Sequence, residues 1–135
     1  MYPLIKNLDD SPFINEYCYL EPQNYYRELN IIKGRGGSFH CAFCHEGAHT
    51  KAGRFRSVEN VGTEIDVYLN NWRGDEPYIL FTDDTFTLNF ERLRKICEGL
   101  MERRKKYNFT FFCKEHFHTL YKNTEMIPYL EKASC

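Results

Sequence analysis

Two cysteines in a glycine-rich part of the chain have the residue type and spacing of metal ligands. Cys41 and Cys44 are separated by two residues, and thiolates at this spacing can hold one metal ion or two corners of an iron–sulfur cluster. A second pair with the same separation, Cys113 and His116, offers a thiolate and an imidazole. These four side chains together form a ligand set that suits tetrahedral zinc.

The composition favours one globular domain with reduced cysteines. The 135 residues include 18 basic and 19 acidic side chains, a balance that gives no electrostatic reason to expect nucleic acid or an anionic membrane as a partner. The sequence has neither a signal-peptide pattern nor an apolar stretch of about 20 residues, so a cytoplasmic protein is expected. In that reducing compartment the six cysteines are expected to be core residues or metal ligands.

Hydrophobic patterns predict that strands and helices alternate along the chain. Strands are predicted at 29–33, 78–81 and 109–113, and helices at 58–71, 88–105 and 123–132. This alternation predicts an α/β domain over residues 29–135, built from parallel βα units with right-handed crossovers. Residues 1–28 contain three of the five prolines and are expected to form an irregular leader.

The loops that follow the three strands carry most of the reactive side chains. They run from Gly37 to His49, from Thr82 to Thr85 and from Cys113 to His118. Functional groups of parallel sheets gather beyond the carboxyl ends of the strands. We therefore expect the three loops to converge at one edge, and one interpretation of the acidic pair in the second loop is that it caps the following helix.

The stretch around the first cysteine pair resembles the cluster loop of radical S-adenosylmethionine (SAM) enzymes. The signature of that family is Cys-x3-Cys-x2-Cys, usually preceded by Arg-Gly and with an aromatic residue just before the last cysteine. Here Arg35-Gly36 precede the loop, Phe43 is the aromatic residue, and Cys41 and Cys44 match the last two cysteines. Gly37 occupies the position of the first cysteine.

The resemblance extends over residues 27–135. Residues 54–65 resemble the start of the first helix in the cobalamin-domain group of that family, and residues 81–87 resemble its second strand with an acidic end. Residues 132–135 resemble a Lys-Ala-Gly-Cys segment that precedes the fourth strand. The resemblance implies the first half of a partial (β/α)6 TIM-like barrel.

The resemblance also implies two cofactors. In the family, three thiolates hold a [4Fe–4S] cluster whose fourth iron binds the amino and carboxylate groups of SAM, and the cluster cleaves SAM to a 5′-deoxyadenosyl radical. Residue by residue, it assigns cluster ligation to Cys41 and Cys44 and places Phe43 beside the adenine. It places three residues near the methionyl amino group: Thr82, Asp83 and Asp84.

Two departures from the family pattern leave alternatives open. Gly37 supplies no ligand. The candidate side chains for the missing cluster ligand are His40, His45, Cys18 and Cys113. Three βα units are half of the barrel, so we expect a fragment or a chain completed by a second chain, with an unspecified small-molecule or peptide substrate. The alternatives are a zinc-binding structural protein that uses Cys41, Cys44, Cys113 and His116, and a scaffold without metal.

Overall fold

A three-stranded parallel sheet forms the centre of the computed structural model, which describes residues 5–13, 28–36, 39, 53–74 and 76–135. Its strand order is β1 (Leu29–Ile31), β4 (Tyr78–Phe81) and β5 (Thr110–Cys113). In register, Ile31 lies beside Phe81, and Phe81 lies beside Cys113. The carboxyl ends of the strands therefore share one edge, and the predicted α/β class with parallel strands is confirmed.

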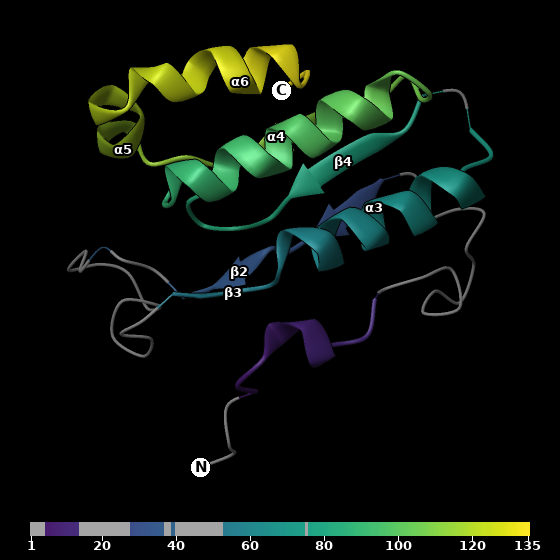
Figure 1. The fold of residues 1–135 in the computed structure, drawn as a ribbon, viewed down its shortest axis with the longest axis horizontal. Coiled ribbons are helices and arrows are strands. Elements are labelled where there is room, and N and C mark those ends of the chain that lie inside the picture. The colour runs from purple at the N-terminus through teal and green to yellow at the C-terminus, as the bar shows by residue number, and fades with distance from the viewer. Residues whose placement is uncertain (1–4, 14–27, 37–38, 40–52, 75) are drawn as a thin grey trace.

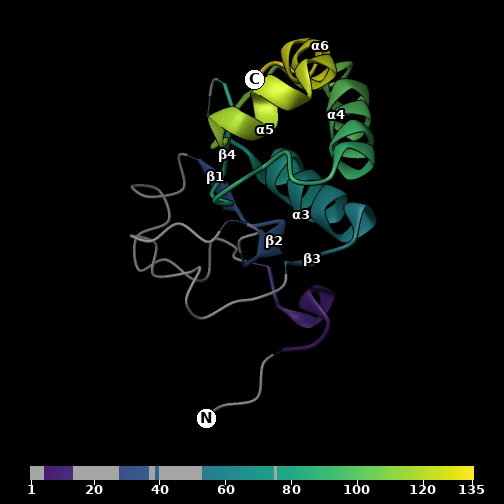
Figure 2. The same cartoon turned by 90° about the vertical axis from the view of Figure 1, so that its left-hand side faces the viewer.

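Two long helices cover one face of this sheet (Figures 1 and 2). They are α3 (Val58–Asn71) and α4 (Phe90–Arg104), which also contact each other. Because side chains alternate along a strand, every second strand residue turns toward the helices. The strands contribute Leu29, Ile31, Ile79, Phe81 and Phe111 to the core, and the helices contribute Val61, Ile65, Tyr68, Leu69, Leu93, Ile96, Cys97 and Leu100.

Side-chain caps define where these helices begin. The Ser57 hydroxyl accepts a hydrogen bond from the Asn60 N–H at 3.0 Å, so α3 begins at the predicted position. The Asn89 side chain accepts from the Arg92 N–H at 2.9 Å, so α4 begins two residues later than predicted. Both helices are amphipathic and turn their buried residues to the sheet.

The predicted third helix differs from the observed structure. The chain forms α5 (Phe117–Lys122), a 3₁₀ turn η3 (Thr124–Met126) and α6 (Ile127–Lys132) instead of one helix over 123–132. The ring of His116 starts α5 early, because its Nδ1 accepts from the His118 N–H at 3.2 Å. Pro128 lies in the first turn of α6, where its missing N–H leaves no intrahelical bond unmade.

A short antiparallel ladder, which the sequence did not predict, follows the first strand. It pairs β2 (Gly34–Arg35) with β3 (Arg54–Phe55). A Cβ atom on Gly34 would come within 2.7 Å of the Phe55 ring, so the close approach requires glycine. The ladder forms the base of the loop that carries the cysteine pair.

The leader includes ordered structure in its described part, residues 5–13. A single 3₁₀ turn, η1 (Leu8–Asp10), buries Leu8, and the Asp9 carboxylate accepts a hydrogen bond from the Ser57 N–H at 2.7 Å. This bond attaches the leader to the start of α3, where an anion also complements the helix dipole.

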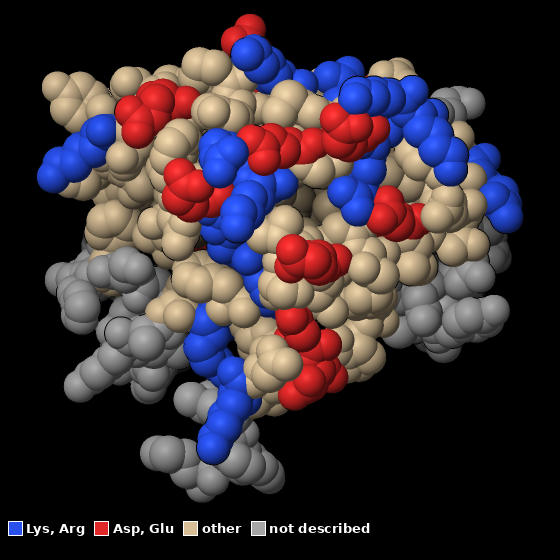
Figure 3. All heavy atoms as spheres, viewed as in Figure 1, with Lys and Arg blue, Asp and Glu red and all other residues tan. Residues whose placement is uncertain are grey.

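The helical face carries charges of both signs. Figure 3 shows acidic and basic side chains interspersed across it. At the end of α4, Arg103 donates two hydrogen bonds to Asp66 of α3, at 2.7 and 2.6 Å, and so joins the two helices. Within the described residues, no helix is both long enough and apolar enough to cross a bilayer.

Candidate functional site

A buried ion pair joins the ends of β1 and β4. The Lys33 Nζ lies 3.6 Å from Asp83 Oδ1, and the Lys33 backbone N–H donates to Asp83 Oδ2 at 3.1 Å. The side chains are only 2% and 5% exposed, respectively. Two aromatic rings cover the ammonium group, with the centroid of Phe86 at 4.7 Å and that of Phe55 at 5.8 Å. The pair therefore holds the two strand ends together in a dry environment.

Burial shifts the ionisation of this cluster. Desolvation lowers the pKa of Lys33, and the attraction of Asp83 opposes that shift. Desolvation likewise raises the pKa of Asp83, opposed by the charge of Lys33. Burial also lowers the pKa of Arg92 in α4, whose guanidinium donates to the Lys33 carbonyl at 3.4 Å and lies over the Phe55 ring. The cluster is thus sensitive to the loss of any one charge.

Glu115 ties the segment after β5 to the segment after β4. One carboxylate oxygen accepts from the Thr87 N–H at 2.7 Å, and the other accepts from the His116 N–H at the same distance. The Phe86 N–H also donates to the Lys114 carbonyl at 3.0 Å. The two loops therefore meet at the carboxyl edge of the sheet, as the sequence predicted.

A cleft of about 180 Å³ lies between the β2–β3 ladder and the segment after β4. We call it the strand-end cleft, and it is lined in part by Arg35, Gly36, Phe55, Thr82, Asp83 and Asp84. The three predicted acidic-segment residues are therefore together at one cleft. Asp83 is buried and engaged by Lys33, whereas Asp84 is exposed and Thr82 is half-buried. The carboxylate available to a ligand is that of Asp84.

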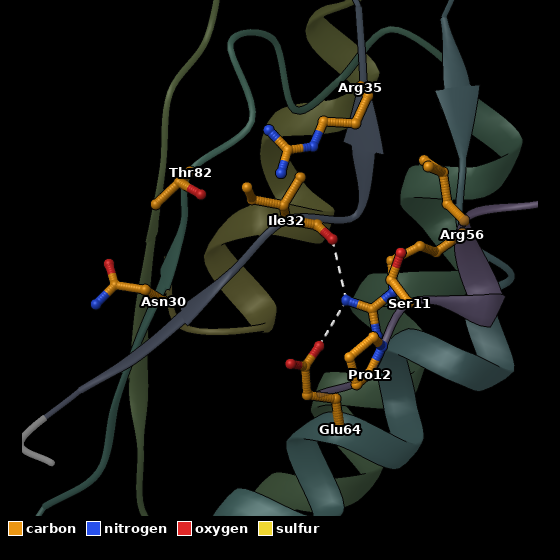
Figure 4. Close-up of a pocket in the computed structure, with 9 residues that line it drawn as sticks. Ser11, Pro12, Asn30, Ile32, Arg35, Arg56, Glu64 and Thr82 are labelled. Carbon is orange, nitrogen blue, oxygen red and sulfur yellow. Dashed lines mark hydrogen bonds and ion pairs between the residues drawn. The ribbon is translucent and has the colours of Figure 1, made fainter. Parts of the chain in front are cut away.

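An adjoining hollow of about 220 Å³ shares Ile32, Arg35 and Thr82 with the strand-end cleft. Arg56 lies at its wall, where its Nη1 donates to the Ile32 carbonyl at 3.0 Å and to Glu64 Oε2 at 2.5 Å (Figure 4). Arg56 therefore joins the residue that follows β1 to α3.

Arg35 is a second charged group at the cleft. Figure 4 shows its guanidinium extending from β2 toward the side of Ile32 and Thr82. The Arg35 side chain is exposed and makes no hydrogen bond or ion pair with any residue in the described part of the chain. Its five N–H donors are therefore available to an anion.

The predicted metal ligands Cys41 and Cys44, with Phe43 and Gly37, lie outside the described residues. The described residue of that loop, Phe39, stacks on His116 with centroids 4.2 Å apart. The loop therefore reaches the end of β5, which carries the other half of the predicted zinc set.

The predicted zinc ligands at β5 have partners within the protein. The Cys113 sulfur lies 3.6 Å from that of Cys135, and His116 Nδ1 accepts from the His118 N–H. Among the described residues, no three His, Cys, Asp or Glu side chains form a group that could hold a metal ion.

Three residues at the site were not predicted from the sequence: Lys33, Arg35 and Glu115. Lys33 had a detectable signal, because it continues the buried alternation of Leu29 and Ile31 onto the helix-facing side of β1. A lysine in that phase is buried and needs a partner. No comparable pattern marks Glu115, whose role depends on a contact between two distant loops.

The chain is similar in sequence to a protein that is named as a methyltransferase. The chain is 38% identical over 96 residues to an uncharacterized methyltransferase of Pyrococcus horikoshii, in an alignment that covers 67% of this chain. The matched part is 20% of the length of that relative. No family model matches the chain, and no solved structure matches it.

Proposed function

We propose that the strand-end cleft is the SAM-binding wall of a radical SAM-type site, and that the adjacent loop holds an iron–sulfur cluster through Cys41 and Cys44. One observation carries the proposal. The base of the cysteine loop, at Arg35 and Gly36, lines the same cleft as the segment from Thr82 to Asp84. The resemblance assigns these segments to the cluster and to the methionyl group. The relative's name as an uncharacterized methyltransferase is consistent with SAM use.

The charges at the cleft fit the methionyl end of SAM, which carries an ammonium and a carboxylate. Asp84 and Thr82 offer oxygen acceptors to the ammonium, and the Arg35 guanidinium offers paired donors to the carboxylate. The buried Asp83 holds Lys33 and fixes the loop that presents Asp84. Phe55 and Phe86 keep water from the ion pair.

The chain's own residues would position the cofactors and exclude water. A bound cluster would supply the electron that cleaves SAM. Cys41 and Cys44 would contribute two of its thiolate ligands, and Gly37 would leave one iron without the family's third thiolate.

The proposal extends to a larger sheet. The Ser134 carbonyl accepts from the Phe111 N–H of β5 at 3.1 Å, which is the type of bond that a further strand would make. Ser134 has a φ of 70°, a conformation that favours glycine, and glycine is the family's residue at this position. Further strands from a longer chain or a partner would complete a partial barrel around a small-molecule or peptide substrate.

Anaerobic reconstitution with iron and sulfide tests the cluster assignment. We expect Gly37→Cys to retain more cluster than the unchanged chain, measured by visible absorption, electron paramagnetic resonance and sulfide content. Equal retention would show that the loop is misaligned. Gly36→Cys is unsuitable as a control, because Gly36 has a φ of 92°, which a cysteine would adopt only with strain. Ser38→Cys instead tests whether the added thiol must be at position 37.

Binding of SAM to the reconstituted Gly37→Cys protein tests the cleft. A charge-assisted hydrogen bond contributes about 1.5–3 kcal/mol, so Asp84→Asn should weaken SAM binding by roughly tenfold to a hundredfold. The matched control is Asp10→Asn, a carboxylate of the leader turn that does not line the cleft. Equal affinities of the two variants would contradict the role of Asp84.

A zinc site is the second candidate, and the stacking of Phe39 on His116 supports it because it brings the cysteine loop to the second ligand pair. If the chain holds a zinc site, it should bind one zinc ion and no sulfide. Replacement of His116 should then abolish zinc binding. The hydrogen bond between the Cys113 and Cys135 thiols argues against the zinc site, because zinc ligation by Cys113 would have to break that hydrogen bond.

A further inference from the structure

Two thiols meet at the open edge of β5. Cys113 ends the strand, and the chain returns after α6 to place Cys135 beside it, with the sulfur atoms 3.6 Å apart. Two backbone bonds fix this approach, from the Phe111 N–H to the Ser134 carbonyl and from the Cys135 N–H to the Leu130 carbonyl, both at 3.1 Å. The sulfurs are therefore held near each other by the fold, although the residues are 22 positions apart.

The environments of the two thiols differ. Cys113 packs against the core, whereas Cys135 is exposed. Cys135 is therefore the accessible thiol and the attacking group.

We propose that Cys113 and Cys135 form a reversible thiol–disulfide site that reacts with small-molecule disulfides such as oxidised glutathione. The Cys135 thiolate attacks one glutathione sulfur, and the first reduced glutathione leaves. Cys113 then loses its proton and attacks the Cys135 sulfur, which releases the second reduced glutathione. The protein loses two hydrogens and two electrons, and oxidised glutathione becomes two thiols.

The disulfide would fasten the segment after α6 to the end of β5. That strand end leads directly into Glu115 and His116, which contact the loop after β4 and Phe39. Closing a loop of this length restricts the unfolded chain and stabilises the fold. This site does not depend on a cluster or on SAM, so it is independent of the proposed function.

Peptide mapping of the full chain tests the proposal. The reduced protein is incubated with oxidised glutathione, alkylated and digested with trypsin. Cleavage after Lys106, Lys114 and Lys132 places the two cysteines in separate peptides, which are also separate from the peptide of Cys97. We expect residues 107–114 to be linked to residues 133–135. Free thiols at both positions, under conditions that oxidise the urea-unfolded chain, would overturn the proposal.

Single variants test the order of attack. Cys113→Ser should trap glutathione on Cys135, and Cys135→Ser should leave Cys113 as a free thiol. Equal glutathione incorporation in the two variants would overturn the assignment of the attacking thiol. Cys97→Ala is the matched control, because Cys97 is buried with its pKa raised to about 12, and it should form the link normally.

Discussion

The substitution Asp83→Asn removes one charge of the buried ion pair and keeps an oxygen that can accept from the Lys33 N–H. The Lys33 ammonium then remains 2% exposed without its ion-pair partner. Removing one partner of a buried pair costs about 3–5 kcal/mol, and the retained backbone bond places the expected loss near 3 kcal/mol. With a urea m-value of about 1.5 kcal/mol/M, the unfolding midpoint should fall by about 2 M.

Two comparisons isolate the charge from other effects of the substitution. Asp84→Asn changes the exposed neighbouring carboxylate and should lower the free energy of unfolding by no more than about 0.5 kcal/mol. Lys33→Met combined with Asp83→Asn removes both charges and should recover most of the lost stability. Equal urea midpoints for Asp83→Asn and Asp84→Asn would refute the reasoning.

The pH dependence of Asp83→Asn follows from the shifted lysine. Burial lowers the pKa of Lys33, and the charge of Asp83 partly offsets this shift. In Asp83→Asn that offset is lost, so the pKa of Lys33 falls further. A lysine whose folded pKa lies below its unfolded value destabilises the fold while it is protonated, and stability returns as pH rises through the folded pKa toward about 10.4. The stability deficit of Asp83→Asn should therefore be smaller at pH 9 than at pH 7.

Two further predictions concern the helices that support the site. Ser57→Ala removes the N-cap of α3 and should lower the free energy of unfolding by about 1 kcal/mol, whereas the exposed Thr63→Ala should change it by less than about 0.5 kcal/mol; equal losses would contradict the capping role. Arg103→Ala and Asp66→Ala should couple by about 0.5–1 kcal/mol in a double-mutant cycle, because their side chains are 23% and 46% exposed. Additive losses would show that this ion pair does not stabilise the packing of α3 on α4.

The sequence predicted the sheet and its two long helices well because the signals are local. The strand predicted at 78–81 and the helix predicted at 58–71 both appear in the structure where expected. The split of the last helix was missed because it depends on the ring of His116 accepting a backbone hydrogen bond. Apolar spacing carries no information about such a cap.

The candidate site was predicted in part. The position of Asp84 at the cleft follows from a loop after a parallel strand, which sequence can indicate. The burial of Asp83 depends on Lys33, which is 50 positions away along the chain. The resemblance gave the two adjacent acids the same role, whereas in the structure Asp83 is buried in an ion pair and Asp84 is exposed at the cleft.

The metal and sulfide content of the anaerobically purified chain distinguishes an iron–sulfur cluster site from a zinc site. The Gly37→Cys variant serves as the reference with three matching cysteines. We expect iron together with acid-labile sulfide in both proteins, at a higher level in the variant. The electron paramagnetic resonance spectrum should change when SAM is added. Stoichiometric zinc without sulfide in both proteins would contradict it.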